Sequence, residues 1–145
     1  SMIEGKTMRP VDLGNYRDFV LDVTSEVSLW HVDFKDRLDQ LQYESPFEIN
    51  WPELITAAMG IQAETGEFSE VVKKCIFQGK EMNEDARFHA MRELGDVIWY
   101  WIHAVNALGY QPDEVIKENI RKLEKRYPGG HFDVERSEVR EEGDI

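Results

Sequence analysis

The feature that most constrains the fold of this chain is the spacing of its apolar residues, which recur every three or four positions over two long stretches. No stretch shows the alternation that is typical of a β-strand. At the start of the first stretch, Asn50 can cap a helix, Pro52 suits its first turn, and Glu53 follows Asn50 by three residues, as in a capping box. We therefore predict a helix from Trp51 to Phe77 that stops at Gly79.

The second long stretch and a shorter third one carry similar end signals. Asn83, followed by two acids, opens a helix that ends near Leu108, before Gly109. The letters "YQPDEV" open a further helix at Pro112, with two acids in its first turn, and this helix ends at "YPGG", residues 127–130. Three helices are thus predicted after residue 50.

The first fifty residues are less regular. Helical spacing of Phe19, Val20, Val23 and Val27 predicts a helix within residues 11–29. Residues 30–49 have a mixed pattern interrupted by "ESPFE", so we predict a loop there, with at most a short helix.

Together these elements predict an all-α chain, folded as a bundle of four or five helices. A length of 145 residues suits one domain, which we place at residues 1–133. Within it, Ser1 and Met2 resemble a cloning remnant, and the first ten or so residues are expected to be a tag or disordered. Residues 134–145 are mostly charged and are predicted to be a disordered tail.

Charge narrows the range of partners. The formal net charge is −12 and the pI is about 4.7, which argues against a nucleic-acid polymer or an anionic membrane, because both attract a basic surface. The most apolar run, residues 97–105, is too short to cross a bilayer. The single cysteine, Cys75, suits packing in a reducing compartment. We expect a cytoplasmic protein, of a bacterial cell or of a host infected by a virus.

Acidic residues lie beside the apolar side of the first long helix. At 100° per residue, Glu70 projects away from the apolar stripe, whereas Glu64 and Glu67 lie on its flank, one turn apart. The stripe is formed by Leu54, Ala58, Ile61, Phe68, Val72, Cys75 and Ile76.

The next helix repeats this arrangement with Glu93 and Asp96, again three residues apart. Packing the two helices together would bring four carboxylates close, which either raises their pKa values or binds a hard divalent ion such as Mg²⁺. A solvated, salt-bridged surface is the alternative interpretation of the same spacing. The stripe of this helix is predicted to consist of Leu94, Ile98, Trp101, Val105 and Leu108.

A glycine precedes the second acid of each pair. Gly66 and Gly95 weaken their helices, which indicates that something approaches the backbone closely at both positions.

Two segments resemble a known family. "AETGEFSE" and "RELGDVIWY", with 25 residues between Glu67 and Glu93, resemble the E-x-x-E…E-x-x-D signature of the MazG-like all-α nucleoside triphosphate pyrophosphohydrolases. "NIRKLEKRYPGGHF" resembles the N-x-x-K-x-x-x-R-Y-P element of small MazG-like proteins. The likeness spans about Trp51 to Phe132.

The resemblance implies a helical bundle completed by a second chain, as a homodimer or a dimer of dimers. It also implies hydrolysis of (deoxy)nucleoside triphosphates to the monophosphate and pyrophosphate with Mg²⁺, for which Mn²⁺ could substitute. Carried over by position, the metal ligands would be Glu64, Glu67, Glu93 and Asp96, with Glu64 as the base that activates water. The residues that bind the substrate phosphates would be Asn119, Lys122 and Arg126, whose offsets place them on one helical face.

Base recognition is the least determined feature. Trp30, His31 and Trp51 lie near the start of the first long helix and could stack on a base, although a place in the core or in an interface is the alternative. Trp99, with its two aromatic neighbours, makes its helix apolar on nearly all sides, which predicts a partner subunit as cover.

Two alternatives stay open at the level of sequence. A phosphoribosyl-ATP pyrophosphohydrolase shares the fold class. A non-catalytic helical partner protein, with acids that serve solubility alone, would need no metal.

Overall fold

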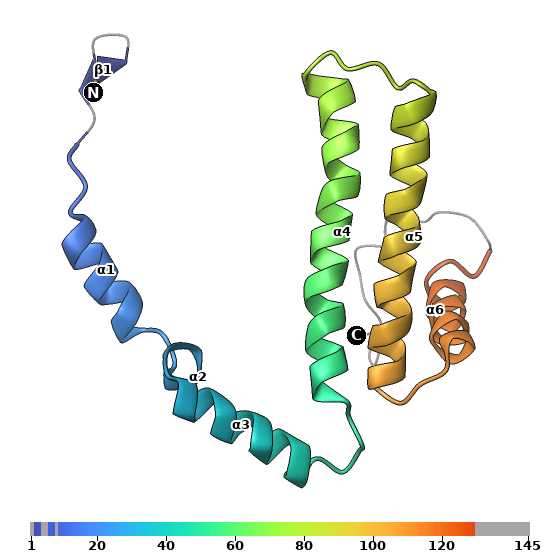
Figure 1. Ribbon diagram of the computed structural model, residues 1–145, viewed down its shortest axis with the longest axis horizontal. Helices are drawn as coiled ribbons and strands as arrows, with labels where there is room; N and C mark the ends of the chain where they lie inside the picture. The colour runs from blue at the N-terminus through green and yellow to red at the C-terminus, as the bar shows by residue number, and fades with distance from the viewer. Residues whose placement is uncertain (1, 4–5, 8, 130–145) are drawn as a thin grey trace. The chain divides into compact units, whose positions relative to one another are not determined.

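The computed structural model describes residues 2–3, 6–7 and 9–129 and confirms the all-α fold class (Figure 1). A two-residue antiparallel ladder of β1 (Met2–Ile3) and β2 (Lys6–Thr7), which the sequence pattern did not predict, precedes the helices. The helices are α1 (Leu13–Asp22), α2 (Glu26–Leu29), α3 (His31–Glu44), α4 (Trp51–Phe77), α5 (Glu84–Ala107) and α6 (Pro112–Arg126). None of these helices is long and apolar enough to cross a membrane.

The chain divides into two units, Ser1–Ser45 and Pro46–Ile145. The first contains the ladder and α1 to α3, and the second contains α4 to α6. The single domain that we expect over residues 1–133 stays a prediction, and the tail at residues 134–145 lies outside the described residues.

The first unit differs from the sequence-based expectation in two ways. The helix predicted within residues 11–29 is broken, because Thr24 donates a hydrogen bond from Oγ1 to the carbonyl of Val20 and Ser25 caps a new helix. The loop predicted for residues 30–49 is wrong, since α3 occupies 14 of its residues. Exposed pairs such as Lys35–Asp39, at 3.0 Å, support α3 where an apolar stripe is weak.

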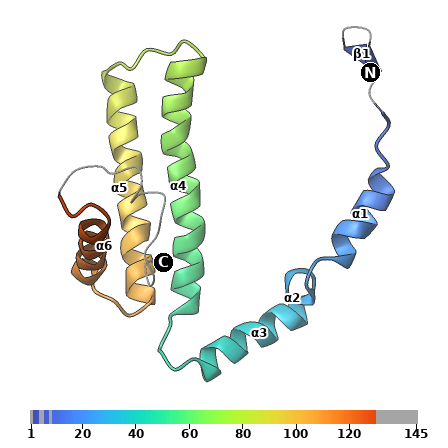
Figure 2. The ribbon, with the colours of Figure 1, turned by 180° about the vertical axis from the view of Figure 1, so that it is seen from behind.

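The second unit is built on the hairpin of α4 and α5, which lie side by side in Figures 1 and 2. Asn50 and Asn83 cap the two helices as predicted, and each helix stops just before a glycine of positive φ, Gly79 at 66° and Gly109 at 84°. The backbone N–H of Asn50 donates to the carbonyl of Ala107 at 3.0 Å and ties the start of α4 to the end of α5.

The capping box predicted at Asn50 forms only in part. Asn50 accepts a hydrogen bond from the backbone N–H of Glu53, but the carboxylate of Glu53 turns to α5 instead of back to Asn50. A reciprocal capping box occurs at the start of α6, between Gln111 and Glu114.

The face of α5 that packs on α4 differs from the predicted stripe. Trp101 and Val105 are at least half-buried, but Leu94, Ile98 and Leu108 are exposed. Small residues let the two helices approach closely, so the contact face runs through alanines instead of the largest apolar side chains. It consists of Ala86, Ala90, Glu93, Val97, Tyr100, Ala104 and Ala107.

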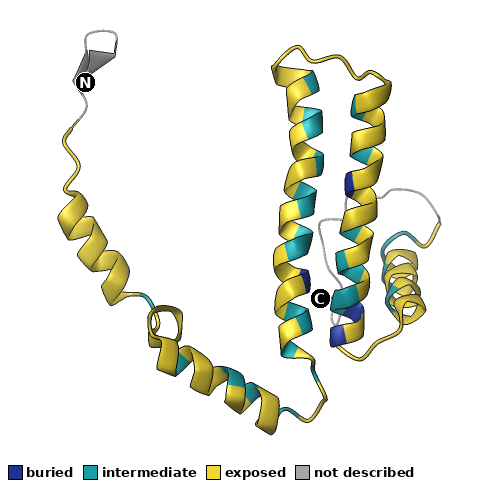
Figure 3. Ribbon diagram, viewed as in Figure 1, coloured by how far each residue is buried: buried dark blue, intermediate teal, exposed yellow. Residues whose placement is uncertain are grey.

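On α4, the half-buried and buried positions recur at alternating intervals of three and four residues, and Figure 3 shows them on the side that faces α5. Ala58 and Ile76, which we assigned to the stripe, are exposed. The helices approach closely at Gly60, because a Cβ at this position would overlap the ring of Tyr100. The face consists of Leu54, Ala57, Ile61, Glu64, Phe68, Val71 and Cys75.

Helix α6 begins and ends as predicted and packs against α5. In Figures 1 and 2, α5 lies between α4 and α6. Few side chains in the second unit are fully covered: Ala57, Val105 and Ala107 are the buried hydrophobic residues among those described.

Candidate functional site

Three carboxylates gather between α4 and α5. One oxygen each of Glu64, Glu67 and Glu93 lies within 4.8 Å of the other two, which is close enough for a single metal ion to contact all three. The hairpin therefore brings together three of the four acids that the sequence singled out.

The helix packing explains why these acids approach each other. Glu64 and Glu93 each occupy a position in the contact face of their helix, where apolar residues precede and follow them. Glu93 is 7% exposed and Glu64 is half-buried, whereas Glu67 lies at the exposed edge. Two of the acids are thus held by the interface between the helices, and the third borders it.

The cluster has strong internal electrostatics. A hydrogen bond to Glu93 raises the pKa of Glu64 to about 7, and burial and the charges of Glu67, Glu93 and Asp96 add to this effect. The same hydrogen bond lowers the pKa of Glu93, helped by hydrogen bonds to Glu67 and His89. Near neutral pH, Glu64 is therefore partly protonated, and the proton is shared in the hydrogen bond with Glu93.

The unsatisfied atoms of the cluster fit a cation. Oε2 of Glu64 and Oε2 of Glu93 are buried without a hydrogen-bond partner among the described residues. Carboxylate oxygens left without donors in a half-dry site are costly, and a hard divalent ion would satisfy both. Glu64, Glu67 and Glu93 are therefore the residues that could hold Mg²⁺ or Mn²⁺.

Asp96, the fourth predicted ligand, lies outside this group of three. It is exposed on α5, lines a cavity of about 320 Å³ with Phe88, His89, Arg92 and Glu93, and its charge contributes to the raised pKa of Glu64. Its assignment as a ligand stays a prediction.

Sequence reasoning missed His89. Its Nε2 lies 2.9 Å from Oε1 of Glu93, one turn further along α5. The spacing of four residues between a histidine and an acid was a signal available in the sequence.

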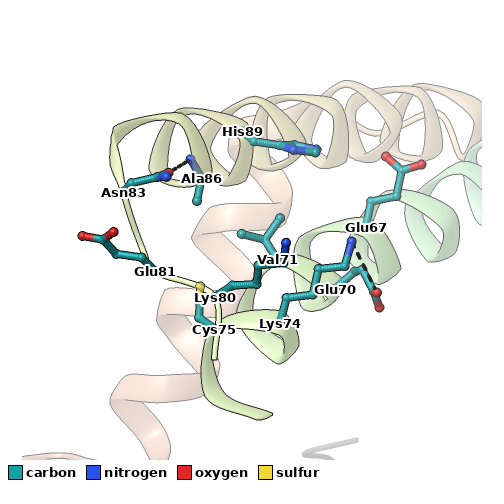
Figure 4. A pocket seen from close by; sticks show the side chains of 10 residues that line it. All are labelled: Glu67, Glu70, Val71, Lys74, Cys75, Lys80, Glu81, Asn83, Ala86 and His89. Carbon is teal, nitrogen blue, oxygen red and sulfur yellow. Dashed lines mark hydrogen bonds and ion pairs between the residues drawn. The ribbon is translucent and has the colours of Figure 1, made fainter. Parts of the chain in front are cut away.

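A second cavity, of about 450 Å³, adjoins the cluster near the turn between α4 and α5 (Figure 4). Glu67 and His89 line one end of it, and Lys80 lies toward the turn, whereas the side chain of Lys74 extends toward Glu70. Lys74 is paired with Glu70 at 3.8 Å. Glu70 also pairs with Lys73, at 3.3 Å, consistent with its predicted position away from the apolar stripe.

The residues predicted to bind phosphate lie on α6, outside the carboxylate cluster. Asn119 is exposed and lines a cavity of about 590 Å³ between α5 and α6, with Val97, Ile98 and Trp101 on its α5 side. Lys122 and Arg126 are half-buried. Their role stays a prediction.

The three residues predicted to stack on a base fall in different units. Trp30 is 60% exposed between α2 and α3, and His31 begins α3. Trp51 begins α4, where it is half-buried and its indole Nε1 is buried without a hydrogen-bond partner among the described residues.

The glycines beside the acids have open surroundings. Within the described chain, nothing lies within 4 Å of a Cβ built at Gly66 or at Gly95. The close approach that we expected at these two positions is therefore absent among the described residues, whereas the ring of Tyr100 packs against Gly60.

Comparisons with known proteins agree with this geometry. The sequence model of the MazG nucleotide pyrophosphohydrolase domain matches residues 53–131. The "Gene 37 protein" of Mycobacterium phage L5 is 35% identical over 74 residues, which are 50% of this chain and 64% of the relative, so the chain spans less than two thirds of that protein. No solved structure matches the chain. Because the matched region covers more than half of the sequence and includes the whole carboxylate cluster, the chain belongs to the MazG nucleotide pyrophosphohydrolase family.

Proposed function

We propose that this protein hydrolyses (deoxy)nucleoside triphosphates to the monophosphate and pyrophosphate in a reaction that depends on Mg²⁺. The observation that carries the proposal is the cluster of Glu64, Glu67 and Glu93, with two buried oxygens unsatisfied, inside the region that matches the family. Mn²⁺ would substitute, because it accepts the same oxygen ligands.

The chain's own residues supply the proton acceptor. Water must lose a proton when it adds to phosphorus, and a base works best when its pKa lies near the working pH. We assign this role to Glu64, whose carboxyl lies in the cluster next to the site proposed for the metal. When bound, Mg²⁺ would neutralise the triphosphate and stabilise the charge of the leaving pyrophosphate.

The negative charge of the chain makes the metal necessary for substrate binding. A protein of net charge −12 repels a triphosphate unless a cation reverses the local field. We assign Asn119, Lys122 and Arg126 of α6 to the phosphates, and Asp96 to the metal as a fourth ligand. The indole N–H of Trp51 has no acceptor among the described residues. We therefore prefer Trp51 to Trp30 and His31 as the residue that contacts the base.

We also propose that a second copy of the chain covers the exposed apolar side chains of α5. Trp99 is 57% exposed, and Leu94 and Ile98 of the same helix are 51% and 55% exposed, so α5 needs cover that α4 and α6 do not give. We assign this cover to a homodimer or a dimer of dimers. Light scattering that shows a stable, active monomer would refute it.

A cytoplasmic location completes the proposal. Nucleoside triphosphates are abundant there, and the lone Cys75 suits a reducing compartment. The phage relative is consistent with a bacterial cell, including an infected one.

Release of pyrophosphate from a panel of (deoxy)nucleoside triphosphates, with Mg²⁺ and with a chelator, tests the proposal. We expect release with Mg²⁺ alone. Phosphoribosyl-ATP in the same panel tests the alternative enzyme. If no nucleotide is hydrolysed by a folded protein, a non-catalytic helical partner becomes the better interpretation.

A further inference from the structure

The histidine next to the carboxylate cluster makes a contact that has a defined direction. Nε2 of His89 lies 2.9 Å from Oε1 of Glu93, and the two residues are one turn apart on α5. An ionised carboxylate has no proton to donate and can only accept hydrogen bonds. Nε2 of His89 must then carry the proton and donate it to the bond.

This bond gives the two oxygens of Glu93 different roles. Oε1 is occupied by His89, whereas Oε2 is buried without a hydrogen-bond partner among the described residues. The side chain of Glu93 is 9% exposed and that of His89 is 60% exposed, so His89 is the solvent-exposed member of the pair. Oε2 is the oxygen of Glu93 that His89 does not occupy.

The position of His89 is also unusual in relation to the cavities. It lines the cavity of about 450 Å³ that contains Glu67 and the cavity of about 320 Å³ that contains Glu93 and Asp96. In Figure 4 its ring lies at the end of the larger cavity where Glu67 is found. His89 therefore borders both cavities and also contacts a carboxylate of the cluster.

We infer that His89 is a positioning residue, which holds Glu93 by one oxygen so that the other is presented to a divalent ion shared with Glu64 and Glu67. The inference rests on the proposed function, since it assigns a role in metal binding. Ligand-orienting partners of this kind typically contribute about 10-fold to 100-fold in metal affinity.

The chain offers a matched control. His103 forms a similar pair with Glu53, at 2.8 Å between Nδ1 and Oε2, but this pair lies outside the carboxylate cluster. His89→Leu and His103→Leu each remove one imidazole of α5 from one glutamate. His89→Gln keeps an N–H donor at nearly the reach of Nε2 and serves as the conservative variant.

The experiment is titration of the full-length, metal-free protein with Mg²⁺ by calorimetry, which needs no turnover. We expect His89→Leu to weaken binding by about 10-fold to 100-fold, His89→Gln to retain most of the affinity, and His103→Leu to bind like wild type. Equal affinity of His89→Leu and wild type would overturn the inference and leave the proposed function intact. If wild type binds no Mg²⁺, both fail together.

A second measurement covers the case in which His89→Leu does not fold. Nitrogen NMR shifts of the imidazole in metal-free wild type report which ring nitrogen is protonated. We expect Nε2 of His89 to carry a proton near neutral pH. A ring protonated at Nδ1 alone would overturn the inference, because Nε2 could not then donate to Glu93.

Discussion

Between them, α4 and α5 hold half-buried or buried acids at two places, and the surroundings of these acids differ. Near the start of α4, Glu53 accepts hydrogen bonds from His103 and Asn106, and these donors lower its pKa. Further along, Glu64 faces Glu93 and has its pKa raised to about 7. Both places lie between the same two helices, so the helical frame does not set the difference; the donors within reach do.

This difference separates an acid whose oxygens have donors within the fold from the acids that we propose to bind a cation. Every oxygen of Glu53 has a donor, so the pair of helices gains from its charge. Glu64 and Glu93 each keep one buried oxygen without a partner among the described residues. Crowded carboxylates of this kind strain the metal-free protein and relax when a divalent ion binds.

The largest effect is expected when the cluster loses its buried member. Glu93→Gln keeps the shape of the side chain but removes its charge, so we expect pyrophosphate release to fall by about 100-fold or more. Glu84→Gln changes an exposed glutamate of the same helix, which is paired with Arg87, and should leave the rate unchanged. Wild-type rates in folded Glu93→Gln would remove the cluster from the reaction.

The pH dependence of stability should show the raised pKa of Glu64. A carboxyl whose pKa is raised by folding stabilises the folded state below its ordinary pKa of 4.5, and this contribution is lost as pH rises through about 7. The lowered pKa of Glu93 acts in the opposite sense, below pH 4.5. Between pH 4.5 and about 7, the melting temperature of the metal-free protein should therefore fall as the pH rises.

Melting curves with a chelator and with Mg²⁺, measured across this pH interval, check the sign. We expect Mg²⁺ to raise the melting temperature most above pH 7, where Glu64 has lost its proton. Glu64→Gln should flatten the metal-free curve. A melting temperature that rises steadily through the interval would contradict the raised pKa.

Substitution of Glu53, whose oxygens have hydrogen-bond donors, should change stability and not metal affinity. Glu53→Gln weakens charge-assisted hydrogen bonds to His103 and Asn106, so we expect the melting temperature to fall by roughly 5 °C. Affinity for Mg²⁺ should not change, because Glu53 is outside the cluster. A loss of affinity as large as that of Glu93→Gln would mean that the two places are coupled.

The smallest effect concerns the glycines. Gly95→Ala adds a methyl group to open space and improves helix propensity, so it should stabilise the chain by about 0.5–1 kcal/mol. Gly60→Ala should destabilise it, because the added Cβ overlaps the ring of Tyr100. Thermal unfolding measures both. Destabilisation by Gly95→Ala would indicate that a second copy approaches α5 at this glycine.

Sequence reasoning performed well where local signals decide the structure. Caps at Asn50 and Asn83, Pro112 at a helix start, and the glycines at 79 and 109 fixed the ends of α4, α5 and α6 to within a residue or two. It failed for α3, whose support comes from exposed polar pairs rather than from an apolar stripe. Propensity and local ion pairs are weak signals in a mixed sequence.

The sequence predicted which acids form the cluster, but it did not predict how far they are buried between the helices. Spacing placed Glu64 and Glu93 on the flank of apolar stripes, but they lie within the packed faces themselves, because the face of α5 runs through alanines and not through Leu94 and Ile98. Helical angles locate residues on one helix, but they do not tell which side meets a neighbour. His89 was missed for the same reason, since its role depends on where Glu93 points.

The most direct test of the account is a crystal of the protein grown with Mn²⁺ and examined by anomalous diffraction. We predict a peak between α4 and α5, within about 2.2 Å of oxygens of Glu64, Glu67 and Glu93. Empty density there at saturating Mn²⁺, with the three carboxylates turned away from each other, would contradict it.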